Sequence, residues 1–298
     1  MIVRSCLFIL LLAGALIRFL YLMELQAHPD FQVPMEYQID MGFNDNTAIS
    51  LAQYCRRQLR LPPIELRFER IIEWTQRRGE YLYRPPTYTV FLAALYFVLG
   101  DSPFGVRAAQ MTLGLCAACL GYLLGKRLYN RFAGLCIYLL VLFYWPLIIY
   151  ESALHSPIMA LFTGVLFLYA AICWAQEGGR RRAALMGLAL SAYVLSVTAM
   201  LIALPLILFW MFWVYGKNHT FNRAIGGVAG AILVFLGAFL VPIFSVTTYN
   251  YVVSGDFVLI SGVAGMTVYI GNQPDSTGYL GPSDSMPVSY THLRAHET

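Results

Sequence analysis

Charged residues are scarce in this chain. They make up 12% of its 298 residues, against about a quarter in an average soluble domain. Hydrophobic residues make up 59%, and the mean hydropathy is +0.62. These values exclude a soluble globular domain, a disordered chain and a fibrous protein. The small basic excess, 20 Lys and Arg against 16 Asp and Glu, is explained by membrane topology, so nucleic-acid binding is not indicated. The sequence predicts an integral membrane protein.

The sequence also lacks the patterns of a metal or nucleotide site. No group of His, Cys and Asp has metal-ligand spacing, and no glycine-rich stretch has the form of a phosphate-binding loop. Cys116 and Cys119 have redox spacing but no second pair, and they lie in an apolar run, which favours packing between helices. We therefore expect no cofactor and leave only a divalent metal open.

Long apolar runs predict an all-helical bundle of about seven crossings. Residues 5–23 form the first, which we expect to be a retained helix because Arg18 interrupts it and no signal-peptide cleavage site follows. The stretch 183–215 is too long for one crossing and should fold back near Ser196–Met200. The other predicted crossings are about 104–125, 132–150, 155–175, 183–199, 200–215 and 223–246.

Short basic clusters between these runs predict the orientation. The positive-inside rule places them all in the cytoplasm if Thr87–Leu99, which is short for a crossing, is an interfacial or re-entrant helix. The extracytoplasmic segments are then about 25–103, Glu151–Ser156, the fold-back and everything after Val246. The clusters are Lys126, Arg127 and Arg131; Arg180, Arg181 and Arg182; and Lys217 and Arg223.

The long first loop is expected to bear two surface helices. Asn44-Asp45-Asn46 offers N-caps to a helix that reaches Leu59, and Pro62-Pro63 opens an amphipathic helix that Gly79 can end. Such helices lie along the membrane surface and frame a site at the lipid–water boundary. Asp40, just ahead of them, is a candidate general base for an acceptor hydroxyl, with a solvated Asp or a helix N-cap as the alternative.

Four segments, in order, resemble motifs of the GT-C membrane glycosyltransferases. The similarity is greatest to the branch that contains protein mannosyltransferases, aminoarabinose lipid A transferases and the Rgt lipopolysaccharide-core transferases. The matches extend over about residues 15–280. They are Asp40-x-x-Phe43-Asn44-x-x-x-Ala48; YRPPTY (83–88) with the following FLAALYFVLGDSPFGVRAAQMTLG; YNRFAGL ahead of a helix ending in Pro146 and Tyr150-Glu151; and GMTVYIGNQPDSTGY.

This resemblance implies roles for particular residues. Asp40 takes the position of the family's catalytic carboxylate in the first extracytoplasmic loop, with Glu36 and Asp45 as fallbacks. Arg84 aligns with a basic residue that lies near the donor phosphate, where a guanidinium stabilises charge on the leaving group. An interfacial Arg that extends to lipid headgroups is the alternative. Asn272, in GNQPDSTG, takes a binding role or only forms a turn.

Two departures from the family pattern bear on donor or acceptor identity more than on reaction class. Ser156 stands where relatives have an acidic residue, and Glu151 or His155 beside it can supply the missing polar group or merely cap a helix. The stretch 196–198 lacks the Arg of the family's Thr-Arg-Pro. Arg18 is expected to be paired or to face the bundle interior.

The resemblance implies an inverting hexosyl- or pentosyltransferase of the bacterial inner membrane, with its active site on the extracytoplasmic side. Its donor would be a polyprenyl-phosphate sugar, and its acceptor a hydroxyl of a lipid, glycan or protein, in lipopolysaccharide or protein glycosylation. A non-catalytic sugar-binding or assembly subunit, or a transporter or flippase, is the alternative. Residues 1–288 form this module, which we expect to be incomplete; SYTHLRAHET (289–298) resembles a translated sequencing adapter.

Overall fold

The computed structural model describes residues 2–27, 39–66, 84–218, 221–262 and 272. Within these ranges the secondary structure is helical and contains no strand, which confirms the all-helical prediction for this part of the chain. The chain divides into two compact units, Met1–Ser261 and Gly262–Thr298. All of the helices given below belong to the first unit.

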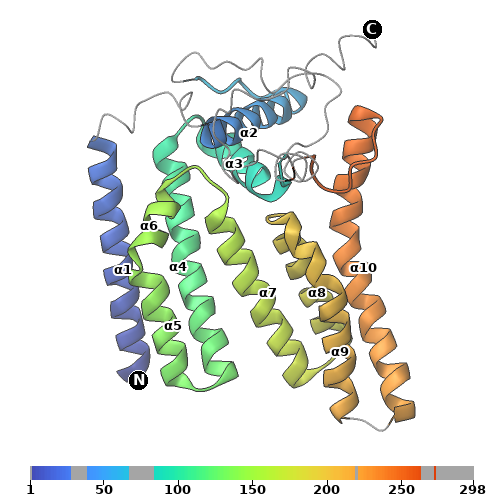
Figure 1. Ribbon diagram of the computed structural model, residues 1–298. Coiled ribbons are helices and arrows are strands. Elements are labelled where there is room, and N and C mark those ends of the chain that lie inside the picture. The colour runs from blue at the N-terminus through green and yellow to red at the C-terminus, as the bar shows by residue number, and fades with distance from the viewer. Residues whose placement is uncertain (1, 28–38, 67–83, 219–220, 263–271, 273–298) are drawn as a thin grey trace. The chain divides into compact units, whose positions relative to one another are not determined.

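Most of the first unit is a bundle of long apolar helices (Figure 1). Five of them are long and apolar enough to cross a membrane, and a bent pair, α5 with α6, raises the number to six. The protein is therefore a membrane-embedded helical bundle. The helices are α1 (Ile2–Ala27), α4 (Pro103–Leu128), α5 (Arg131–Phe143), α6 (Trp145–Ser152), α7 (Pro157–Glu177), α8 (Arg180–Val194), α9 (Leu204–Asn218) and α10 (Phe221–Ser254).

The seventh expected crossing falls on α8. This helix has 15 residues, whereas a helix needs about 20 residues to cross the apolar core of a bilayer. It ends at Val194, and the short 3-10 helix η4 (Thr198–Ala203) leads into α9. The helix therefore breaks close to the fold-back predicted near Ser196–Met200, while a seventh crossing is not established by helix length.

A bend of 50° separates α5 from α6. Pro146 lies in the first turn of α6, where it has no backbone N–H to donate and its ring crowds the preceding turn. Tyr144 ends α5 by donating its N–H to the carbonyl of Leu140, and its own carbonyl then accepts from Leu147. Beyond the bend, Glu151 in the last turn of α6 contacts Arg18 of α1 and lies against Gly114 of α4.

Two further helices, α2 (Ile39–Gln58) and α3 (Pro86–Leu99), pack together at one end of this bundle (Figure 1). With 14 residues, α3 is too short to cross, as expected. Ile49 of α2 and Tyr96 of α3 are fully buried in a shared apolar cluster. The cluster also contains Val106 at the start of α4 and Leu154 just before α7, so it fixes both short helices onto the ends of the long ones.

The predictions for the first loop need two corrections. Asn44, Asp45 and Asn46 lie inside α2 and do not cap it, because the helix begins five residues earlier, at Ile39. Residues 61–66, where a second helix was expected to open, are not helical. Residues 67–83, over which that helix was expected to continue, lie outside the described part of the chain.

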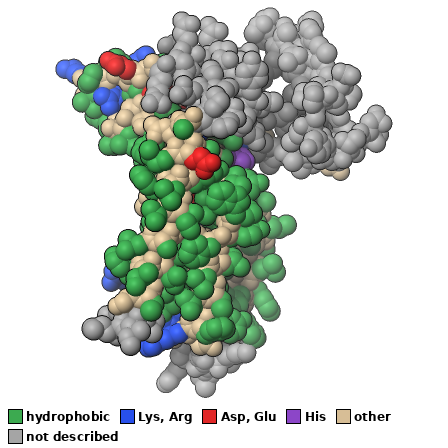
Figure 2. Space-filling model, turned by 90° about the vertical axis from the view of Figure 1, so that its left-hand side faces the viewer, with side chains coloured by type: hydrophobic (Ala, Val, Ile, Leu, Met, Phe, Trp, Pro, Cys, Tyr) green, Lys and Arg blue, Asp and Glu red, His purple; other side chains and the backbone are tan. Residues whose placement is uncertain are grey.

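The opposite end of the bundle carries the basic clusters. Arg127, at the end of α4, donates to the Glu177 carboxylate at the end of α7 (2.7 Å). Arg182, in the first turn of α8, binds the same carboxylate. The first two basic clusters therefore lie together, as predicted, and Figure 2 shows Lys and Arg side chains at both ends of the bundle. The side chains of Lys217 and Arg223 lie outside the described residues.

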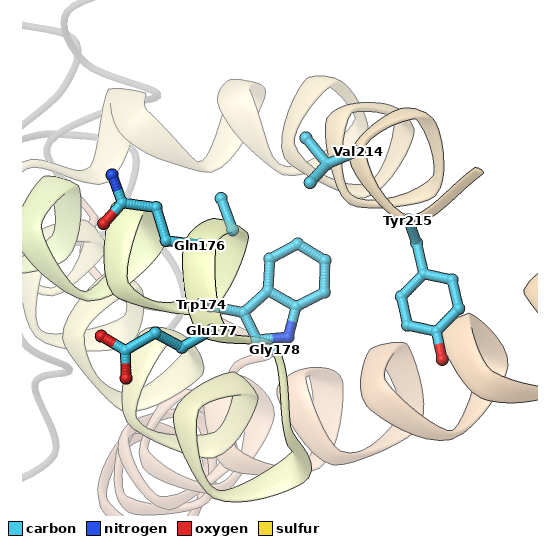
Figure 3. Close-up of a pocket in the computed structure, with 7 residues that line it drawn as sticks. Trp174, Gln176, Glu177, Gly178, Val214 and Tyr215 are labelled. Atoms are coloured by element: carbon cyan, nitrogen blue, oxygen red, sulfur yellow. The ribbon is translucent and has the colours of Figure 1, made fainter. Parts of the chain in front are cut away.

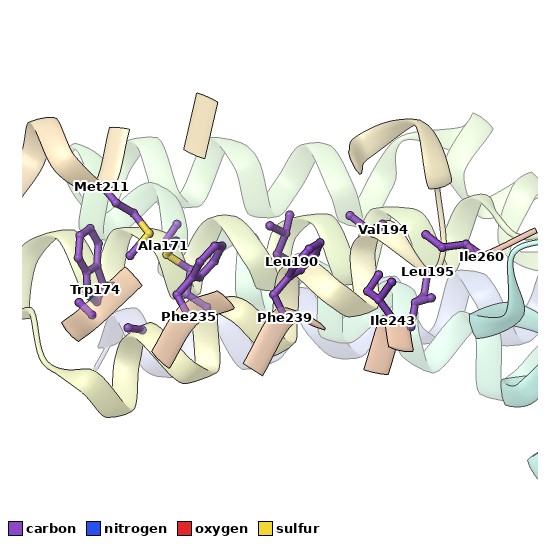
Figure 4. Packing of buried hydrophobic residues seen from close by; sticks show 13 residues of the cluster. Ala171, Trp174, Leu190, Val194, Leu195, Met211, Phe235, Phe239, Ile243 and Ile260 are labelled. Carbon is purple, nitrogen blue, oxygen red and sulfur yellow. The ribbon is translucent and has the colours of Figure 1, made fainter. Parts of the chain in front are cut away.

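The core between α8 and α10 is apolar and closely packed. Phe235 and Phe239 of α10 stack at 6.2 Å between ring centroids and lie against Leu190 of α8 (Figure 4). Gly187 permits this approach, because a Cβ atom there would overlap the carbonyl oxygen of Phe235.

Candidate functional site

A buried ion pair joins the first helix to the end of α6. Arg18 Nε donates to Glu151 Oε2 at 2.7 Å, and Nη2 donates to Oε1 at 2.9 Å. Both residues are within 1% of full burial. Arg18 Nη1 also donates to the carbonyl oxygens of Leu142 (2.8 Å) and Gly14 (3.2 Å). The expectation that Arg18 is paired is confirmed.

Glu151 was expected from the sequence to bind substrate or to cap a helix end. In the structure both of its carboxylate oxygens accept from Arg18, and the residue has no solvent-exposed surface. A bidentate guanidinium–carboxylate pair combines two charge-assisted hydrogen bonds, each roughly twice as strong as a bond between neutral groups. Glu151 therefore anchors α6 in this arrangement and does not present its carboxylate to a ligand.

Two polar residues of α4 hold the turn that follows Glu151. Gln110 Nε2 donates to the carbonyl oxygens of Glu151 (2.8 Å) and Ala153 (2.7 Å). Arg107 Nε donates to the carbonyl oxygen of Ser152 (2.8 Å). Three consecutive carbonyls that leave the helix without intrahelical partners are thus satisfied, and the turn that carries His155 is fixed to α4.

The same network reaches α3 and the residue before it. The Tyr88 hydroxyl donates to Gln110 Oε1 (2.9 Å), and its burial raises the pKa of Tyr88 above its ordinary value, so it remains a donor. At the start of α3, Thr87 donates its backbone N–H to the Leu195 carbonyl (3.3 Å) just beyond α8. Half-buried Arg84 directly precedes Pro85, the N-cap residue of α3.

The sequence-predicted base and its fallbacks lie in or near α2. Asp40 is in the first turn of α2, and its side chain lies outside the described residues, as does Glu36 entirely. Asp45 is 3% exposed and accepts a hydrogen bond from the Tyr96 hydroxyl. Because this bond ties α2 to α3, Asp45 has a structural role.

Two predicted site residues, His155 and Asn272, lie outside α2 and α3. His155 is partly buried in the turn between α6 and α7, two residues beyond the Ala153 carbonyl that Gln110 holds. Asn272 is exposed and belongs to the second unit, so the structure does not relate it to the other predicted residues. The structure thus brings together the segments of Asp40, Arg84 and His155.

Sequence reasoning assigned no role to Arg107 and Gln110, although both lie in the quoted FGVRAAQ stretch. The sequence did contain a signal for such a role, because two strongly polar residues three positions apart share one face of an otherwise apolar helix. Both are buried and bind the turn.

Among the described residues no group of three or more His, Cys, Asp and Glu could hold a metal ion. No family model, no curated protein and no solved structure matches this chain.

Proposed function

We propose that this protein is a membrane glycosyltransferase of the GT-C type, which moves a sugar from a polyprenyl phosphate to a hydroxyl acceptor. One observation carries the proposal. The three segments that bear the motif residues Asp40, Arg84 and His155 are far apart in the sequence, yet they meet at one end of the bundle. The apolar cluster of α2 and α3 and the bonds from Tyr88 through Gln110 to Ala153 join them there.

The proposed reaction is a displacement at the anomeric carbon of the sugar. The acceptor hydroxyl attacks that carbon while the Asp40 carboxylate takes its proton. The bond between the anomeric carbon and the phosphate oxygen breaks, and the polyprenyl phosphate leaves with the bonding electrons. Arg84 stabilises the charge on that phosphate, because a guanidinium binds phosphate oxygens through two parallel N–H donors. The anomeric configuration is inverted.

The proposed orientation places the reaction outside the cytoplasm. The basic end of the bundle, where Arg127 and Arg182 meet at Glu177, faces the cytoplasm by the positive-inside rule. The end that carries α2 and α3 then faces the opposite side of a bacterial inner membrane. This assignment counts α8 as the seventh crossing. It lies in the chain between the crossings formed by α7 and α9.

A transporter is the main rival from another class. Transporters place polar groups near the bilayer midplane on broken helices, and the bend before α6 and the buried Arg18–Glu151 pair resemble that feature. The two charges of this pair, however, neutralise each other, and the remaining donors of Arg18 bind backbone carbonyl oxygens. This satisfied pair favours a structural role over an ion pathway. The activity test described next distinguishes an enzyme from a non-catalytic sugar-binding subunit.

The test is transfer from defined polyprenyl-phosphate sugars by the purified chain, with Asp40→Asn compared to Glu24→Gln. Glu24 is an exposed carboxylate on the last turns of α1, at the same end of the bundle. Loss of a general base lowers the rate by about 10²–10⁴-fold, so Asp40→Asn should lose transfer to that extent while Glu24→Gln keeps it. Full activity in Asp40→Asn would rule out the assigned base, and no transfer by the unaltered chain with any donor would favour the binding subunit.

A further inference from the structure

A pocket of about 210 Å³ lies at the basic end of the bundle, away from the proposed transferase site. It is formed by the end of α7, from Trp174 to Gly178, and by Val214 and Tyr215 of α9 (Figure 3). The proposed sugar transfer makes no use of it.

The pocket contains an unsatisfied hydrogen-bond donor. Trp174 is 2% exposed, and its indole Nε1–H has no hydrogen-bond partner within the described part of the chain. Figure 3 shows the indole of Trp174 between the end of α7 and Tyr215, with its nitrogen on the Tyr215 side. Buried donors in native proteins are almost always paired, so this N–H is available to an acceptor that enters the pocket. A ligand that fills this pocket must therefore offer an acceptor to Trp174.

The electrostatics of the pocket rim favour an anionic acceptor. Glu177 is bound by both Arg127 and Arg182, so two guanidinium groups share one carboxylate. Arg182 Nη1 also donates to the carbonyl oxygen of Gly178 (3.4 Å), and Arg127 Nη1 donates to the side-chain oxygen of Gln176 (3.3 Å). Both guanidiniums therefore flank the segment that lines the pocket, and they leave a net positive charge there.

The position of the pocket indicates which kind of molecule carries that anionic group. It lies at the last turn of α7, an apolar helix of spanning length, and therefore close to the level at which the apolar core of a bilayer ends. Basic pockets between helices at this depth are suited to phospholipid headgroups. We propose that the pocket binds the headgroup of an anionic phospholipid, whose phosphate oxygen accepts from Trp174 Nε1 beside Arg182 and Arg127. This proposal is independent of the proposed transferase activity.

The experiment measures lipid binding to the purified full chain in detergent micelles by native mass spectrometry. The unaltered chain should bind phosphatidylglycerol in preference to phosphatidylcholine. Trp174→Phe keeps an aromatic ring but removes the donor, and the loss of one hydrogen bond to a charged group should lower the affinity for phosphatidylglycerol roughly tenfold. Trp213→Phe is the matched control, because Trp213 lies on α9 outside the pocket and is 51% exposed.

A second variant distinguishes the loss of the hydrogen-bond donor from a change in packing caused by Trp174→Phe. Arg182→Gln alters a partly exposed side chain and should also reduce the preference for phosphatidylglycerol. Equal binding of the two lipids, or unchanged binding in both Trp174→Phe and Arg182→Gln, would overturn the proposal. Displacement of the lipid by millimolar inorganic phosphate would overturn the lipid as the source and identify a free-phosphate site.

Discussion

At the scale of single residues, the Arg18–Glu151 pair is a buried ion pair between two of the described helices, α1 and α6. We expect Glu151→Gln to lower the free energy of unfolding by about 3–5 kcal/mol, because it leaves the Arg18 guanidinium buried without its counter-charge. Unfolding by denaturing detergent in mixed micelles measures this change.

The double variant Arg18→Met with Glu151→Leu is the control for that measurement. Replacement of both charges by apolar groups removes the desolvation cost of each, so the double variant should be more stable than Glu151→Gln alone. If Glu151→Gln is as stable as the unaltered chain, the pair does not carry the role that its burial indicates.

The sequence predicted that Arg18 is paired but did not predict Glu151 as its partner. An Arg within an apolar run must find a partner, so the pairing of Arg18 followed from its position. Its partner lies 133 residues away, and Glu151 was instead considered as a ligand for substrate. A contact over that separation depends on how α1, α4 and α6 pack together. The hydrophobic periodicity of a single segment carries no information about that packing.

At the scale of helices, the end of α6 approaches α4 at a glycine. A Cβ atom at Gly114 would overlap the Glu151 carboxylate, so the absence of a side chain there makes room for the ion pair. We expect Gly114→Ala to destabilise the protein by about 1–3 kcal/mol, since a packed core resists an added methyl group. The midpoint of thermal unfolding, measured in the same detergent, reports this loss.

Gly237 provides a matched control within another long helix. A Cβ atom at Gly237 of α10 meets no other atom within 4 Å. Gly237→Ala should therefore leave the unfolding midpoint unchanged or raise it, because Ala favours a helix over Gly by up to about 1 kcal/mol. Equal effects of the two substitutions would mean that the contact at Gly114 does not determine how α6 packs on α4.

Helices were predicted well where burial in lipid sets the pattern, and less well in the first loop. Long apolar runs indicated α1, α4, α7 and α10, because each spans about the thickness of a bilayer. The start of α2 was misplaced, since Asp45 has the local character of a cap but is used in a long-range bond to Tyr96. The bend at Tyr144 divides a run that reads as continuous, although Pro146 gave a local sign of it.

At the scale of the whole bundle, polar groups separate to its two ends. One end carries α2, α3 and the turn held by Gln110, and the other carries the ion pairs of Glu177 with Arg127 and Arg182. The proposed chemistry depends on which end faces the cytoplasm. The sequence predicted this separation because charge clusters and apolar runs alternate along the chain, while the packing of the two short helices onto the bundle required the structure.

Cysteine labelling tests the orientation directly. Cys55 is exposed on α2, and Tyr129, which is 80% exposed, follows α4 at the basic end. We compare a variant that retains only Cys55 with a cysteine-free variant that carries Tyr129→Cys, each treated in intact cells with a membrane-impermeant maleimide. Cys55 should react at once, whereas the cysteine at position 129 should react only after the membrane is permeabilised, because the positive-inside rule retains that end in the cytoplasm. The reverse pattern would place Asp40 and Arg84 on the cytoplasmic side, where the proposed extracytoplasmic transfer could not occur.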